Sequence, residues 1–302
     1  MPRGVWFSVG VVLLFVVLPF VYGNHDLLFS MMMYLVLAQG INVLFGFTGY
    51  LPFGYVGFFG AGAYGMSLAI LLLHFPPFAA LIAGAAAAVL VALVLAPLLR
   101  LSGAYFAIAS LAASEVLYYV ISNPHLTSIT QGPYGINLAA VYDSSASYAV
   151  MVAVLALALG MVVYLRNSRT GLALQAIREE PVSAGFAGVN VVRERTRAWL
   201  MSAALAGLAG GAYAWHVSVF YPKPVFDLNI SVFAIVFTLF GGVATLSGPV
   251  VGTLLLYGLY NWIGISQPQY FQLVFGVVIV ALVLFLPNGL VSLLRRVGAN
   301  VP

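Results

Sequence analysis

The chain has 302 residues, of which 63% are hydrophobic and only 6% are charged, and its mean hydropathy is +1.09. Soluble globular proteins carry about 25% charged residues, so this composition excludes that class and indicates an integral membrane protein. The sequence contains no cysteine, which excludes disulfides and thiolate sites, and its four histidines lack ligand spacing, so no metal site is expected. The formal net charge of +4 comes from basic residues at helix ends and not from a basic patch with interleaved aromatics, so no nucleic-acid partner is expected.

Apolar stretches follow one another along almost the whole chain. A span needs about 20 apolar residues, and this length predicts ten spans, of which the eighth and ninth are short. The first is interpreted as a retained helix because no small-residue cleavage site follows it. We expect an all-α polytopic bundle, one transmembrane domain over residues 1–302. The spans are approximately Val5–Tyr22, Leu27–Phe45, Phe53–Leu73, Phe78–Leu99, Gly103–Ser122, Tyr148–Leu165, Ala198–Val217, Leu228–Phe240, Val250–Ile263 and Tyr270–Leu286.

The basic residues predict the orientation of these spans. With the N-terminus inside, Arg3, Arg100, the six arginines of the Arg166–Arg197 segment, Arg295 and Arg296 all lie on the cytoplasmic side, and only Lys223 lies outside. Cytoplasmic loops carry the excess of Lys and Arg in membrane proteins. Both termini and the Arg166–Arg197 segment are therefore expected in the cytoplasm.

Two glycine-rich stretches interrupt the helical pattern, at Gly46–Gly65 and Phe240–Gly252. Irregular backbone inside a bilayer is tolerated only where protein buries it or where it lines a water-filled cavity. Both stretches are therefore candidates for a translocation path, with close helix packing and a turn as the alternative. The path candidates in and beside them are Gln39, Asn42, Gly49, Pro52, Gly54, Gly241 and Gly242.

One acidic residue lies within a predicted span. Glu115 follows Gly103 by twelve residues, or about 18 Å of helix. A carboxylate at that depth must be paired, hydrated or neutral, so Glu115 is either a contact in the path or a hydrogen-bonded structural residue. Ser110, on a stripe of small residues in the same span, and Asn261 are weaker path candidates.

Two polar segments connect the spans. The loop Asn123–Ser145 is rich in turn residues and is either a docking surface for an external protein or a solvated connector. The Arg166–Arg197 segment holds six of the eleven basic residues, and Pro181 and Gly188 predict two short helices that meet at Glu179–Glu180. The alternative is that the arginines of this segment only set the membrane topology. That alternative explains the charge but not the two-helix projection.

The chain resembles a permease subunit of the branched-chain amino acid ABC importers, of the M type, from Leu35 onward. The resemblance is carried by INVLFGFTGYLPFGYVGFFGAGAY, LRLSGAYFAIASLAASE, GLALQAIREEPVSAGFAGVNVVRERTRAWLMSAALAGLAGGAYA, LFGGVATLSGPVVG and LPNGL. The matching positions are Asn42, Gly46, Gly49, Gly54, Phe58, Phe59, Gly60, Gly62, Tyr64, Arg100, Gly103, Tyr105, Glu115, Gly171, Ala176, Ile177, Arg178, Glu179, Ala184, Gly188, Asn190, Ser202, Ala203, Gly207, Gly210, Gly211, Gly241, Gly242, Gly248, Pro249, Gly252, Pro287 and Gly289.

The resemblance implies a type II importer-like permease in a bacterial or archaeal plasma (inner) membrane. It implies a homologous permease partner in a heterodimer, two cytoplasmic ABC ATPase subunits that use ATP and Mg²⁺, and an extracytoplasmic substrate-binding protein. This chain would hold no cofactor itself. The segment 166–197 would be the coupling loop between the two halves. Its ATPase-coupling residues would be Gly171, Ala176, Arg178, Glu179, Glu180, Ala184, Gly188 and Asn190.

Some residues depart from the family pattern and leave the substrate open. Tyr50, Pro52 and Tyr55 replace common polar residues of the glycine-rich stretch, and Phe233 stands where an acidic residue is frequent. Urea, short amides or another small polar solute therefore rival the branched-chain amino acids.

The residues provide little for two other functional classes. An ion-coupled secondary transporter would need more intramembrane charge than Glu115 alone provides. An intramembrane enzyme would need a nucleophile–base set, which the sequence pattern does not indicate. There is also no Gly-x4-Gly-Lys-Ser/Thr motif, so a transporter of this kind must draw its energy from partner subunits.

Overall fold

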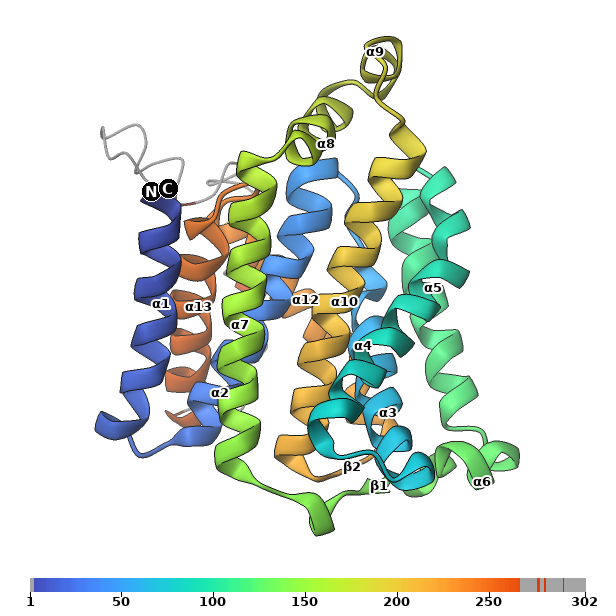
Figure 1. Ribbon diagram of the computed structural model, residues 1–302, viewed down its shortest axis with the longest axis vertical. Helices are drawn as coiled ribbons and strands as arrows, with labels where there is room; N and C mark the ends of the chain where they lie inside the picture. Colours follow the sequence, from blue (N-terminus) through green and yellow to red (C-terminus); the bar gives the residue numbers. More distant parts are fainter. Residues whose placement is uncertain (1–2, 267–275, 278–279, 281–289, 291–302) are drawn as a thin grey trace.

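The computed structural model describes residues 3–266, 276–277, 280 and 290. The described part is almost entirely helical (Figure 1), and two strands of two residues each pair as a small antiparallel ladder. The elements are α1 Arg3–Val21, α2 His25–Ile41, α3 Val56–Leu73, α4 Pro77–Val94, α5 Gly103–Ile121, α6 Thr127–Thr130, β1 Ile136–Asn137, α7 Ser144–Asn167, α8 Arg169–Glu179, α9 Pro181–Phe186, α10 Val191–Val217, β2 Val219–Phe220, α11 Pro222–Val225, α12 Leu228–Gly241 and α13 Ser247–Ser266.

The first nine predicted spans each coincide with a described helix, and the tenth, Tyr270–Leu286, lies outside the described residues. By length and hydropathy alone, 7 helices of the described part can cross a membrane. The predicted multi-pass helical bundle is thereby confirmed. In α2 the helix continues past Ile41 into a π-helical turn over Asn42–Gly46, where the glycine-rich stretch begins.

Small residues let three helices approach closely at the centre of the bundle. A side chain added at Gly62 of α3 would overlap the backbone of Gly207 in α10, and one added at Gly207 would meet Ala88 of α4. Gly210 lies in the same way against the backbone of Phe59. In lipid, where no hydrophobic force drives helices together, such close contact is the main source of packing energy. The small residues Gly207 and Gly210 therefore lie on the packing face of α10.

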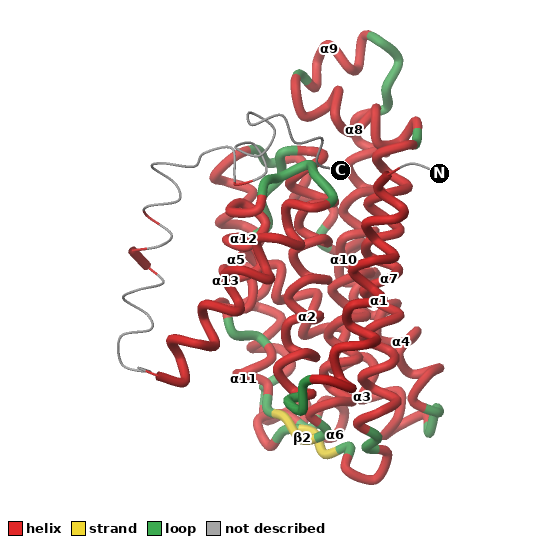
Figure 2. The backbone as a smooth tube through the Cα atoms, turned by 90° about the vertical axis from the view of Figure 1, so that its left-hand side faces the viewer, coloured by secondary structure: helices red, strands yellow, loops and turns green. Residues whose placement is uncertain are grey.

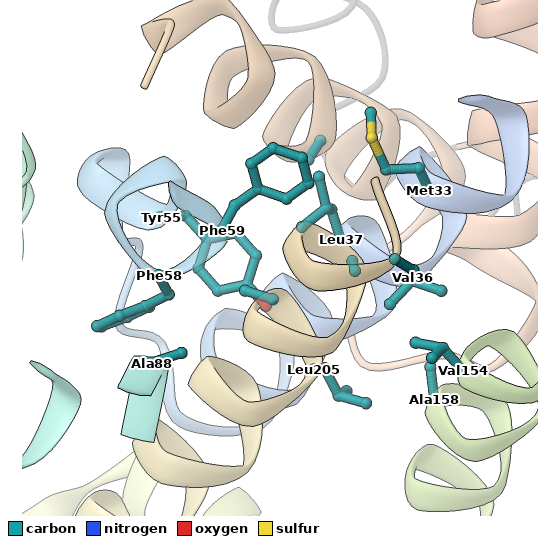
Figure 3. Close-up of a cluster of buried hydrophobic side chains, with 14 of the residues drawn as sticks. Met33, Val36, Leu37, Tyr55, Phe58, Phe59, Ala88, Val154, Ala158 and Leu205 are labelled. Atoms are coloured by element: carbon teal, nitrogen blue, oxygen red, sulfur yellow. The ribbon is translucent and has the colours of Figure 1, made fainter. Parts of the chain in front are cut away.

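A continuous apolar core surrounds this contact, built from α2, α3, α4, α7 and α10. Figure 3 shows Leu37 of α2 and Leu205 of α10 near Phe59 of α3 and near Tyr55, which directly precedes α3. Tyr55 is 1% exposed, and its hydroxyl donates to the Ser202 carbonyl of α10 at 2.8 Å. Tyr55, a departure from the family pattern, is thus a core residue that ties α3 to α10.

The two ends of the bundle differ in form. Helices α8 and α9 project beyond the other helices at one end, which we call the knob end (Figures 1 and 2). The opposite end, which we call the far end, carries α6, α11 and the β1–β2 ladder, with Ile136 paired to Phe220. The segment from Asn123 to Ser145 is ordered there, because Ile136 is buried and the indole of Trp215 donates to the Val141 carbonyl at 2.8 Å.

Candidate functional site

The knob, which we define as residues Ser168–Asn190, has the two short helices that the sequence predicts. Each helix of this region begins at a side-chain cap: Ser168 Oγ accepts from Gly171 N at 3.1 Å, and Glu180 Oε1 accepts from Val182 N at 3.2 Å. At the start of α10, Asn190 Oδ1 accepts from Arg193 N at 3.0 Å. Capping of this kind satisfies backbone donors that a short helix leaves free. Glu180 and Asn190 are therefore capping residues that shape the knob.

The outer surface of the knob is apolar at its tip. Phe186 is 89% exposed and Val182 is 64% exposed, whereas Ala184 is 4% exposed and packs inward. Gly188 adopts a φ of +86°, a conformation that L side chains rarely take. Among the other predicted coupling residues, Gly171 is buried against the backbone of Leu165, and Ala176, Arg178 and Glu179 are exposed.

Arg178 connects the knob to the membrane-spanning bundle. Its guanidinium Nη1 donates to the carbonyl oxygen of Gly46 at 2.6 Å, and its stem passes beside Gly49, where φ is +80°. Gly46 ends the π-helical turn, and the last carbonyls of a helix lack intrahelical partners, so a charged donor there stabilises the broken end of α2. One predicted coupling residue thus touches two positions of the first glycine-rich stretch.

The two glycine-rich stretches meet at this knob end in a buried polar contact, which we call the clamp. The Asn42 side chain donates from Nδ2 to Thr245 O at 2.8 Å and accepts from Ala244 N at 2.8 Å. Gln39 Nε2 donates to Leu246 O at 2.9 Å, and Gln39 Oε1 accepts from Asn42 Nδ2 at 3.3 Å. Gln39 and Asn42 have no exposed surface. These two path candidates therefore serve to hold the loop between α12 and α13 against the end of α2.

The remaining glycines of the second stretch shape the loop that the clamp holds. Gly242 adopts a φ of +119°, and a side chain on Gly241 would overlap the backbone of Gly248. Ala244 also has a positive φ, +60°, which turns its N–H toward Asn42. Close backbone contact is thus the role that the structure gives to Gly241 and Gly242.

Gly54 and Ser110 form a separate contact between the start of α3 and α5. Gly54 N donates to Ser110 Oγ at 3.2 Å, and a side chain on Gly54 would overlap the Ser110 carbonyl. Pro52 is buried just before this contact. Asn261 lies in the last turns of α13.

Glu115 lies toward the far end, where it lines a cavity of about 230 Å³ between α5 and the segment that leads into α12. Two further charged residues line the same cavity: Lys223, which the sequence marked only by its predicted position outside, and Asp227, which it did not single out. Asp227 also lines a neighbouring cavity of about 650 Å³, whose wall is rich in tyrosines. In the sequence, both residues lie just before the predicted span that begins at Leu228, and Lys223 is the one basic residue predicted outside. That position is the feature that could have pointed to them.

The far end also contains a Ser–His–Asp arrangement that the sequence pattern did not reveal. Ser147 Oγ lies 3.0 Å from His216 Nδ1, and His216 Nε2 lies 3.1 Å from Asp26 Oδ1. Ser147 has no exposed surface, and the His216 ring stacks on Phe29 at 3.8 Å between centroids. A nucleophile must reach its substrate, so this network ties α2, α7 and α10 together and is no catalytic site. Among the described residues, no group of three His, Cys, Asp or Glu side chains could hold a metal ion.

Comparison with known proteins relates this architecture to transport permeases. The chain is 28% identical over 330 residues to the high-affinity branched-chain amino acid transport system permease protein LivM of Escherichia coli strain K12, covering 96% of this chain and 75% of the relative. It is 28% identical over 312 residues to the protein of the same name from Salmonella typhimurium strain LT2, covering 90% and 71%. The probable branched-chain amino acid transport permease protein LivH of Methanocaldococcus jannaschii is 29% identical over 145 residues, 45% of each chain.

A family model also matches most of the chain. The model described as branched-chain amino acid transport system / permease component matches residues 25–283. The match includes the clamp, the knob and the far-end cavities. This chain therefore belongs to the branched-chain amino acid transport system permease component family.

Proposed function

We propose that this chain is a membrane subunit of an ATP-driven importer for branched-chain amino acids. The observation that carries the proposal is the knob, a capped projection with an apolar tip that is joined through Arg178 to the end of a broken membrane helix. A moving partner can shift a permease between states only through contacts that differ between those states. Urea or short amides remain the rival substrates, and an ion-coupled transporter remains the rival class.

The proposed assembly has three kinds of partner. Two ATPase subunits, which bind ATP and Mg²⁺, dock on the knob end, and a soluble binding protein delivers the solute to the far end. A homologous permease subunit covers the face of α5 that carries Glu115, since an exposed carboxylate at membrane depth is costly against lipid. The remaining apolar helix surfaces, such as that of α1, contact lipid in a bacterial or archaeal plasma (inner) membrane.

The proposed orientation places both termini and the knob in the cytoplasm, with the far end outside. The chain contains no cysteine, so Ser183→Cys on the knob and Ser145→Cys on the far end introduce single, exposed thiols. In intact cells, an impermeant thiol reagent should label Cys at 145 and leave position 183 unlabelled until the membrane is opened. Labelling at 183 alone in intact cells would reverse the orientation.

The proposed activity is tested by reconstitution of the full set of subunits in proteoliposomes. ATP inside and loaded binding protein outside should produce uptake of leucine, isoleucine or valine, with no uptake in vesicles that lack the ATPases. Uptake of urea or a short amide in place of the amino acids would support the rival substrates. Uptake driven by an ion gradient without ATP would support the rival class.

A further inference from the structure

We propose that Glu115, Lys223 and Asp227 form a solute-selective site that recognises the zwitterionic backbone of an amino acid at the far end. The inference rests on the proposed function, because it names the part of the solute that the importer would recognise. The three residues come from two segments, α5 and the α11–α12 connection, and line one cavity of about 230 Å³. The cavity lies below the roughly 300–1,000 Å³ of sites for drug-sized ligands, which suits a small solute.

The charged groups of this cavity form no ion pair with one another. Among the described residues, the ion pairs within 4.0 Å join Arg197 to Glu194 and His216 to Asp26, and neither carboxylate of the cavity pairs with Lys223. Asp227 Oδ1 accepts from Asn229 N at 2.9 Å and so caps α12, which leaves its second oxygen for a ligand. One ammonium and two carboxylates are therefore available on the cavity wall.

Apolar residues complete the wall. Phe226 is 5% exposed and its ring fills the space over Gly60 of α3, where any side chain would overlap it. Tyr118 lies beside Phe226 with 6.3 Å between ring centroids, and Leu228 begins α12 at the same cavity. Phe226 thus fixes the connection that carries Lys223 and Asp227 against α3.

This set of groups matches a free amino acid better than the rival solutes. Lys223 supplies a donor for the α-carboxylate, and Glu115 and Asp227 supply acceptors for the α-ammonium, while Tyr118 and Leu228 offer apolar contact for a branched side chain. Hydrogen bonds between charged groups are the stronger ones and lose most when one partner is absent. Urea carries no charge to satisfy Lys223 or the carboxylates, so it leaves them unpaired.

Protection of a single thiol tests the site. Leu228→Cys places a thiol on the cavity wall of the otherwise cysteine-free chain, and Ser128→Cys places a matched exposed thiol on α6, outside the cavity. The nucleotide-free complex, without binding protein, is treated with methyl methanethiosulfonate, and modification of this chain is followed by mass spectrometry. Leucine at about ten times its Kd leaves roughly a tenth of the sites free, so it should slow modification at 228 roughly tenfold and should leave 128 unaffected. Isocaproate, which lacks the ammonium, and urea should not protect.

A second substitution in the same chain tests the contribution of each charged residue to leucine binding. Lys223→Gln or Glu115→Gln in the Leu228→Cys background should abolish protection by leucine, and Asp227→Asn, which keeps an oxygen for the α12 cap, should weaken it. Should Leu228→Cys fail to insert, Tyr118→Cys reports on the same wall. Equal protection by leucine and urea, or full protection in the Lys223→Gln variant, overturns the site. A Leu228→Cys complex that takes up leucine while showing no protection refutes this inference alone, whereas a reconstituted wild-type complex that takes up no amino acid refutes the proposed function.

Discussion

Replacing Phe186 with aspartate is expected to detach the ATPase subunits and to abolish ATP-driven uptake, while the chain still inserts in the membrane. Phe186 lies at the tip of the knob with 89% of its side chain exposed, an unusual position for a phenylalanine that contacts no partner. Truncation of an aromatic residue at the centre of an interface lowers the binding free energy by about 2–4 kcal/mol. A charge placed in the pocket of that residue adds a desolvation cost. We therefore expect at least a roughly thirtyfold weaker complex.

The measurement is co-purification of the ATPases with the permease, followed by substrate-stimulated ATP hydrolysis in proteoliposomes. Tyr134→Asp is the matched control, because Tyr134 is 75% exposed on the far end of the bundle. It should leave ATPase binding intact. Phe186 is a cleaner probe than Ala184, since Ala184 packs inside the knob and a larger residue there would disturb the knob itself. Normal co-purification and uptake of the Phe186→Asp variant would assign the knob a purely topogenic role.

Replacing Asn42 with leucine is expected to lower the free energy of unfolding by about 2–5 kcal/mol, because two buried backbone groups lose their partners. The leucine can neither accept from Ala244 N nor donate to Thr245 O, both of which Asn42 satisfies at 2.8 Å. Asn42 has no exposed surface, so an unpaired backbone group facing it would lie away from water, at a cost in free energy. The loop between α12 and α13 should then separate from the end of α2.

Thermal unfolding in detergent measures this loss. Asn167→Ala is the control, since Asn167 is exposed at the end of α7 and donates only to the Val163 carbonyl of its own helix. That variant should melt close to the wild type. If Asn42→Leu melts together with Asn167→Ala, the clamp contributes no stability. Arg178 also contacts the π-helical turn beside Asn42, so we expect the surviving Asn42→Leu protein to hydrolyse ATP without matched uptake.

The sequence by itself determined the class of the protein and most of its helices. Stretches of about 20 apolar residues predict membrane-spanning helices, because a backbone in lipid must satisfy its hydrogen bonds within a helix. The knob was equally readable, since Pro181, Gly188 and the capping side chains act over a few neighbouring residues. The motifs that carry the family resemblance lie in the same segments. What these local signals have in common is that their partners lie close along the chain.

Only the tertiary structure decided what the polar residues of the spans touch. Asn42 resembled a path residue, yet its partners Ala244 and Thr245 are about 200 positions away and bury it in the clamp. Glu115, a lone carboxylate in the sequence, shares a cavity with Lys223 and Asp227, which belong to another segment. Helical periodicity gives the face that a residue occupies but not the helix that packs against that face. Which distant groups meet is fixed by the packing of α3, α4 and α10 through small residues, and that arrangement exists only in the folded bundle.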